Sequence, residues 1–138
     1  MAELARKIER IAKHALWAII GFFFGKKKSP PLPINFTSAS SVLIIRTDRL
    51  GDVVLSTPVY ESIKKSFPHL RVSVIVSHIN MPILTDNPNV DKIIPFDPKN
   101  LGTIIKQLRC NRFDIAFTLN KKFSVIASLL ALVSKTKY

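Results

Sequence analysis

The chain has 138 residues, of which 47% are hydrophobic and 22% are charged, a length that suits one ordinary domain and a composition that excludes an intrinsically disordered protein. Its formal net charge of +12 predicts an anionic partner. Charge alone leaves nucleic acid, an anionic membrane surface and a phosphorylated substrate open, because all three attract a cationic protein.

The first 28 residues carry seven basic and two acidic side chains. Apolar residues at helical spacing predict an amphipathic helix, and the unbroken apolar run that follows over residues 15–24 is too short to span a bilayer. This segment is suited to the surface of an anionic membrane. The residues expected to contact that surface are aromatic or basic: Trp17, Phe22, Phe23, Phe24, Lys26, Lys27 and Lys28.

Two other interpretations of residues 1–28 remain open. The helix can instead dock on the protein's own core or on a partner, and a basic start before a short apolar run is also the layout of a secretory signal peptide. The lysines at 26–28 oppose the signal peptide, because they stand where a small-residue cleavage site would lie.

Residues 29–40 contain three prolines and four serine or threonine residues. Such a composition favours extended, unpaired backbone. We therefore expect a tether there, between the amino-terminal helix and a folded unit that spans residues 41–138.

Strand and helix patterns alternate from residue 41 onward. Apolar, β-branched runs predict strands, and the segments between them predict helices. The expected strands are residues 41–46, 70–77, 91–96 and 113–119. The first expected helix starts at Thr57-Pro58 and stops at Pro68. A short helix or turn is expected over residues 81–87, and further helices over residues 100–110 and 123–134. Repeated strand-helix units predict an α/β fold, a Rossmann-like parallel sheet with helices on both faces.

A polar loop, residues 47–52, follows the first strand, at the edge where open parallel sheets bind ligands. Gly51 permits a tight turn or the close approach of a ligand, and the next helix start offers free N–H groups to an anion. The dinucleotide fingerprint and the Walker motif are missing. One cysteine and three isolated histidines give no metal-binding motif, so we expect neither a resident cofactor nor a metal.

Three strings of this sequence, "VLIIRTDRLGDVVLSTPVYESIKKSFP", "NPNVDKIIPFD" and "RFDIAFTL", occur in that order. Together they resemble the amino-terminal half of the bacterial ADP-heptose:lipopolysaccharide heptosyltransferases, glycosyltransferase family 9, over about residues 42–138. The specific features are Asp52 and Pro58 at this spacing after such a strand, then Asn87-Pro88, then Phe113-Asp114.

The resemblance implies a GT-B architecture, in which an amino-terminal Rossmann-like domain binds the sugar acceptor and a carboxyl-terminal domain binds ADP-heptose or a related nucleotide sugar. We expect the donor domain to lie outside this chain, which would then be a fragment without activity of its own. The implied reaction is inverting and metal-independent. Its implied acceptor is an anionic, lipid-linked saccharide of the Kdo-lipid A type, on the cytoplasmic face of the bacterial inner membrane.

The resemblance also implies roles for individual residues. Asp52 corresponds to the catalytic base of the family, although its position alone favours a helix cap, a role that aspartate fills well. The arginines of the loop are candidate forks for acceptor anions, with a solvated turn as the alternative. The expected acceptor-binding residues are Arg46, Thr47, Arg49, Gly51, Lys121 and Lys122.

Two functions of other classes stay open at this point. A membrane-tethered module can keep the basic acceptor-binding surface without catalysing transfer. A nucleic-acid-binding protein is favoured by the net charge alone.

Overall fold

The computed structural model describes residues 34–47, 49–119, 124–134 and 136. The predicted amino-terminal helix with its membrane-contacting residues, the first part of the predicted tether, and Lys121 and Lys122 lie outside the described residues.

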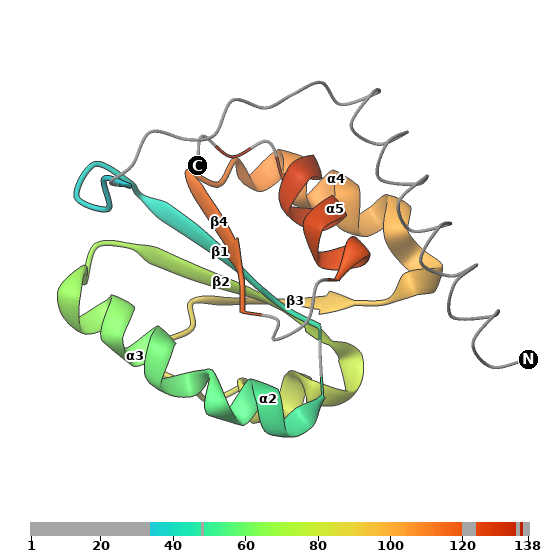
Figure 1. The fold of residues 1–138 in the computed structure, drawn as a ribbon, viewed down its shortest axis with the longest axis horizontal. Coiled ribbons are helices and arrows are strands. Elements are labelled where there is room, and N and C mark those ends of the chain that lie inside the picture. The colour runs from blue at the N-terminus through green and yellow to red at the C-terminus, as the bar shows by residue number, and fades with distance from the viewer. Residues whose placement is uncertain (1–33, 48, 120–123, 135, 137–138) are drawn as a thin grey trace, which may run out of the picture. The chain divides into compact units, whose positions relative to one another are not determined.

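Four strands of the described chain form one parallel sheet (Figure 1). Their bounds are β1 (Ser41–Arg46), β2 (Arg71–Ser77), β3 (Lys92–Phe96) and β4 (Ile115–Thr118). The spatial order is β3-β2-β1-β4, so the chain moves outward from β1 to β3 and then crosses back to place β4 on the other side of β1. This order confirms the predicted Rossmann-like sheet and puts its switch point between β1 and β4.

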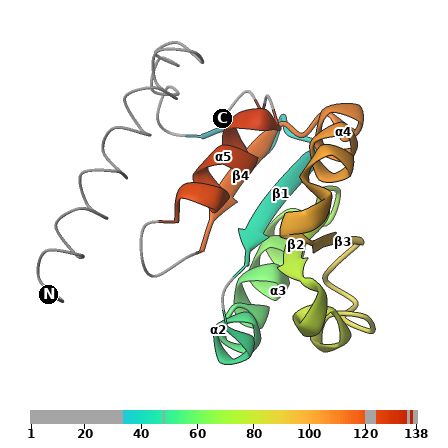
Figure 2. The same cartoon turned by 90° about the vertical axis from the view of Figure 1, so that its right-hand side faces the viewer.

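Helices cover both faces of the sheet, as predicted. One face carries α2 (Leu50–Leu55), α3 (Thr57–Ser66) and the 3₁₀ helix η1 (His78–Ile83). The other face carries α4 (Leu101–Asn111), which follows the short η2 (Pro98–Asn100), and α5 (Val125–Val133). Figures 1 and 2 show the two layers on opposite sides of the strands.

Two hydrophobic cores result from the alternation of side chains along β1. Val42 and Ile44 point into the core under α2 and α3, while Leu43 and Ile45 point into the core under α4 and α5. All four side chains are fully buried. Burying an aliphatic side chain of this size contributes about 1.5–3 kcal/mol, so β1 is the central element of the domain.

Helix α2 is the main departure from the predicted elements. The predicted loop, residues 47–52, overlaps α2, and a single helix was expected to start at Thr57-Pro58. The structure confirms the start of α3 at Thr57 but adds α2 before it, because the fully buried Val53 anchors this segment to the first core. Glycine and β-branched valines lower helix propensity, so tertiary contacts such as this one must stabilise the helix.

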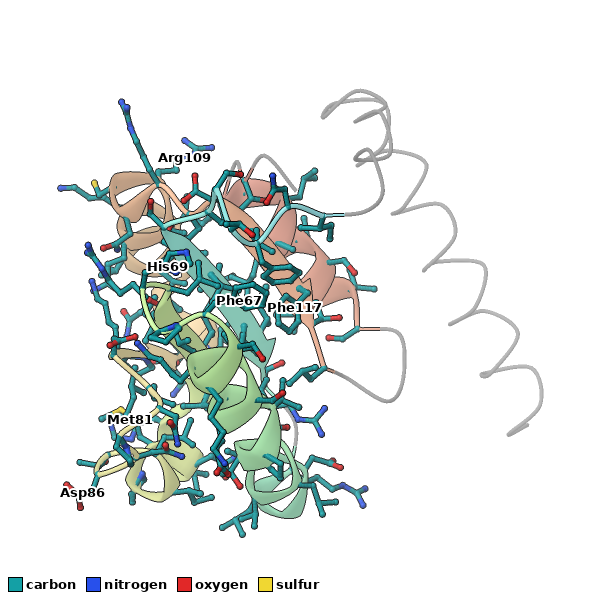
Figure 3. The ribbon with its side chains drawn as sticks, turned by 90° about the vertical axis from the view of Figure 1, so that its left-hand side faces the viewer. Phe67, His69, Met81, Asp86, Arg109 and Phe117 are labelled. Carbon is teal, nitrogen blue, oxygen red and sulfur yellow. The ribbon has the colours of Figure 1, made fainter. Side chains whose placement is uncertain are left out.

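The predicted tether is also too long at its carboxyl end. Phe36 stacks on Phe67 with ring centroids 5.3 Å apart, and Ala39 is only 5% exposed. Phe67 and Phe117, both labelled in Figure 3, pack against the same core as Phe36. Residues 34–40 therefore belong to the folded domain, because their few apolar side chains reach its core.

Two aspartates join neighbouring strands by hydrogen bonds at the edge of the sheet opposite the loop after β1. Asp114 accepts hydrogen bonds from the backbone N–H groups of Ser40 (3.0 Å) and Ser41 (3.2 Å), which joins the start of β4 to the start of β1. Asp91 accepts from the N–H of Val72 (2.6 Å) and pairs with Lys64 Nζ at 2.7 Å. The Phe113-Asp114 feature of the sequence thus has a structural role.

The Asp91 contacts predict a pH-dependent contribution to stability. Partial burial opposes ionisation of Asp91, but the hydrogen bonds from Lys64 and Val72 N–H and the charges of Lys64 and Arg71 outweigh it and lower the pKa below the ordinary 3.8. A carboxyl group whose pKa is lowered by folding stabilises the protein above its unfolded-state pKa, and that contribution is lost as the pH falls through the lower folded-state value.

We expect Asp91→Asn to reduce the free energy of unfolding by about 1 kcal/mol at pH 7, because the amide keeps an acceptor oxygen but loses the ion pair. Urea denaturation of the 138-residue chain measures this, and the difference from wild type should vanish near pH 2. The control is Glu61→Gln, which removes an exposed ion pair with Lys65 (2.6 Å) and should leave stability unchanged. A deficit for Asp91→Asn that persists at pH 2 would contradict the electrostatic explanation.

Candidate functional site

The carboxyl end of β1 is where the candidate site lies. Arg46 is the last residue of β1, and α2 begins four positions later at Leu50. Because β2 and β4 flank β1, the loops after β1 and β4 leave the sheet at its switch point (Figure 1). Ligands bind at this point in open parallel sheets, since loops and helix starts converge there.

Arg46 is buried, with 5% of its surface exposed. Its Nε and Nη2 donate hydrogen bonds to the backbone carbonyl of Asp52 at 3.1 and 3.0 Å, and its Nη1 donates to the carbonyl of Leu119. This arrangement differs from the solvent-facing anion fork predicted from the sequence. The guanidinium is engaged with the main chain of α2 and with the residue that follows β4.

Asp52 lies in the first turn of α2, with about one third (35%) of its side chain exposed. Its Oδ1 is 3.4 Å from Nη2 of Arg46, which makes the carboxylate the counter-ion of a buried cation. The helix cap expected as the alternative role is not what the structure has, because Arg49 occupies the N-cap position. A carboxylate in a first helical turn is nevertheless favoured by the helix dipole.

Gly51 is exposed and helical, in the position before Asp52. A Cβ atom built on Gly51 would meet no heavy atom within 4 Å, so neither packing nor a tight turn requires glycine here. The position that a side chain at residue 51 would occupy is open space. Of the other predicted acceptor-binding residues in the described chain, Thr47 is half-buried and Arg49 is exposed.

A buried serine hydroxyl supports the backbone of Asp52. Ser56 Oγ donates a hydrogen bond to the Asp52 carbonyl at 2.7 Å, the same oxygen that Arg46 contacts. Tyr60 is fully buried nearby, and burial raises the pKa of its hydroxyl although Ser56 and the charge of Arg46 partly oppose the shift. Tyr60 therefore stays neutral at ordinary pH and closes the core beneath α2.

A polar hollow of about 500 Å³ lies between the start of α3 and the segment after η1. Its lining includes Thr57, Pro58, Glu61, Asp86, Asn87 and Pro88. Figure 3 shows Asp86 projecting outward from this part of the chain. The sequence marked Thr57-Pro58 and Asn87-Pro88 only as features of a resemblance, and no pattern could show that these distant pairs meet at one surface.

Two searches of the described residues gave negative results. No group of three or more His, Cys, Asp or Glu side chains in this part of the chain could hold a metal ion. No described helix has the length and hydrophobicity needed to cross a membrane.

No protein-family model matches the chain, but individual relatives do. It is 27% identical over 96 residues to lipopolysaccharide heptosyltransferase 3 of Escherichia coli K12, a match that covers 63% of this chain and 28% of that protein. It is 29% identical over 111 residues to lipopolysaccharide core heptosyltransferase OpsX of Haemophilus influenzae, covering 78% of this chain and 31% of the relative.

The fold has a counterpart among solved structures. A glycosyl transferase of family 9 from Veillonella parvula superposes with a TM-score of 0.65 at 22% identity, over 75% of this chain and 31% of that one. The chain spans less than a third of the length of each of these proteins. The chain is therefore similar in sequence to lipopolysaccharide heptosyltransferases, and it shares the fold of a glycosyl transferase of family 9.

Proposed function

We propose that this chain provides the acceptor-binding domain of a heptosyltransferase, which transfers heptose from ADP-heptose to the inner core of lipopolysaccharide, and that Asp52 is its catalytic base. One observation carries the proposal. Asp52 presents a partly exposed carboxylate at the switch point of a Rossmann-like sheet, in a relative of such enzymes.

The proposed reaction is an inverting displacement. The Asp52 carboxylate takes the proton of an acceptor hydroxyl while the hydroxyl oxygen forms a bond to the anomeric carbon of the heptose. The bond from that carbon to the diphosphate breaks, and its electron pair leaves with ADP. A carboxylate within hydrogen-bond reach of the hydroxyl is what this step requires of the acceptor side.

The acceptor is proposed to be an anionic lipid-linked saccharide of the Kdo-lipid A type. Arg49 is exposed next to α2 and can pair with a carboxylate or phosphate of that acceptor, because a guanidinium binds such groups through two parallel hydrogen bonds. Thr47 and the open side of Gly51 would lie against its sugar ring, and Lys121 and Lys122 would add positive charge after β4. The donor nucleotide sugar is proposed to bind mainly to a second domain outside these residues.

Membrane association fits the same proposal. A lipid-linked acceptor stays at a membrane surface, and residues 1–28 combine aromatic and basic residues with a short apolar run. We propose that this segment holds the protein peripherally on the inner face of the bacterial inner membrane.

Asp52→Asn should lower kcat for heptosyl transfer by roughly 100- to 10,000-fold, the usual contribution of general base catalysis. Acceptor affinity should stay within about threefold, because a single hydrogen bond contributes little net binding energy. The assay follows transfer from ADP-heptose by the complete protein that carries this sequence. Asp97→Asn, which replaces the half-buried carboxylate that caps η2 after β3 with another good capping residue, is the control and should leave kcat unchanged.

Normal turnover by Asp52→Asn would remove Asp52 as the base. Tight acceptor binding by the wild-type protein without any transfer would instead favour the membrane-tethered, non-catalytic module. Tight and salt-sensitive binding to duplex DNA in place of acceptor binding would favour the hypothesis of a nucleic-acid-binding protein.

Deletion of residues 1–28 should release the protein from vesicles that contain anionic lipid, since each Lys or Arg near such a surface adds about 1 kcal/mol of attraction. Vesicle co-sedimentation measures the bound fraction. A milder variant, in which Lys26, Lys27 and Lys28 become glutamine, should bind with intermediate affinity. Unchanged sedimentation of the deletion variant would place the membrane contact elsewhere in the chain.

A further inference from the structure

We infer that Arg46 is a positioning residue for the proposed reaction: it holds the Asp52 carboxylate in place by tying α2 to the end of β4 across the switch point. This inference rests on the proposed function, because it assigns to Arg46 a role that acts through Asp52.

The contact with α2 fixes the backbone of Asp52. Two nitrogens of one planar guanidinium, Nε and Nη2, converge on the Asp52 carbonyl at 3.1 and 3.0 Å. Ser56 Oγ donates to the same carbonyl at 2.7 Å. A carbonyl oxygen held by three donors cannot turn without breaking several hydrogen bonds, so the first turn of α2 has one defined orientation relative to β1.

The carboxylate itself is aligned by charge. Nη2 of Arg46 lies 3.4 Å from Oδ1 of Asp52, with 6% of the arginine side chain exposed against 35% of the aspartate side chain. A buried cation needs a counter-charge, because desolvation is costly, so Oδ1 is drawn inward. About a third of the Asp52 side chain (35%) stays exposed to solvent, where a hydroxyl can approach.

The third contact crosses the sheet. Nη1 of Arg46 donates to the carbonyl of Leu119, the residue directly after β4, while the Leu119 N–H donates to Ile45 at 3.3 Å. Arg46 therefore connects both elements that border the switch point. Any widening between α2 and the end of β4 must break a hydrogen bond of the buried guanidinium, which ties the position of Asp52 to that of Leu119.

Lysine cannot reproduce this arrangement. An ammonium group supplies the charge as a single point, whereas the guanidinium reaches Asp52 and Leu119 through separate nitrogens in one rigid plane. Arg46→Lys therefore preserves the counter-charge and removes the tie, and Arg46→Met removes both.

The experiment compares these variants in heptosyl transfer by the complete protein that carries this sequence. Arg46→Met should lower kcat on the order of 100-fold, the effect of a misplacement of about 1 Å, with the acceptor KM unchanged. Arg46→Lys should restore part of that kcat. In the Asp52→Asn background, Arg46→Met should cause no further loss, because a positioning residue has nothing left to position. The matched control is Arg71→Lys, which should keep wild-type kcat because Arg71 is the first residue of β2 and lies at the edge of the sheet away from the site.

A second measurement uses the 138-residue chain and needs no activity. The Nε–H proton of Arg46 should exchange slowly with solvent in nitrogen-proton NMR spectra, since it is buried and donates to Asp52, whereas that of the exposed Arg71 should exchange fast. Slow exchange of the Arg46 Nε–H proton in the Asp52→Asn variant would show that the hydrogen bond to the backbone carbonyl of residue 52 survives in that variant. Fast exchange of Arg46 in the wild-type chain would overturn the inference even if Arg46→Met fails to fold.

The outcomes separate the inference from the function on which it rests. Full kcat for folded Arg46→Met together with an inactive Asp52→Asn overturns the positioning role and leaves the proposed function standing. If Arg46→Met loses acceptor affinity and stability but keeps its kcat, the positioning role is also overturned, and Arg46 only stabilises the fold. An active Asp52→Asn variant removes the proposed base, and the inference fails with it.

Discussion

A buried arginine at the end of the central strand is the constraint on which the site depends. Arg46 carries a full positive charge although only 5% of its surface is exposed, so its surroundings must supply hydrogen-bond acceptors and a counter-charge. The carbonyls of Asp52 and Leu119 and the carboxylate of Asp52 meet that need. One desolvated guanidinium therefore ties the first turn of α2 to the residue after β4 and orients the candidate base.

The carboxylates at the two edges of the sheet have different roles. At the amino ends, Asp114 and Asp91 are used up in backbone hydrogen bonds and an ion pair, so their carboxylates hold strands together. At the carboxyl ends, Asp52 keeps 35% of its side chain exposed and pairs with Arg46 at 3.4 Å. Asp91 is equally exposed, at 36%, so the two carboxylates differ in their partners: Asp91 accepts a hydrogen bond from a strand N–H and pairs with Lys64 at 2.7 Å, whereas Asp52 faces a buried guanidinium at the edge where ligands bind.

Sequence patterns predicted the fold well because its strongest signals are local. β1 was predicted at its observed bounds since an unbroken β-branched run has few alternatives, and the start of α3 followed from Thr57-Pro58. Helix α2 was missed because Gly51 and the valines oppose helix formation, whereas the tertiary contacts that stabilise it, the burial of Val53 and the hydrogen bonds from Arg46, are not visible in the sequence. The role of Arg46 was inaccessible for a related reason: no local pattern reveals that an arginine beside a polar loop is buried and contacts a residue 73 positions away.

The central claim is that an acceptor hydroxyl binds against the exposed part of the Asp52 carboxylate. A crystal structure of the chain with a soluble Kdo-containing acceptor analogue tests this most directly. The account predicts an acceptor hydroxyl about 2.6–3.2 Å from a carboxylate oxygen of Asp52, over the open side of Gly51, with the Arg46 contacts unchanged. An analogue bound with every hydroxyl beyond the reach of Asp52, even by one bridging water, would contradict the account.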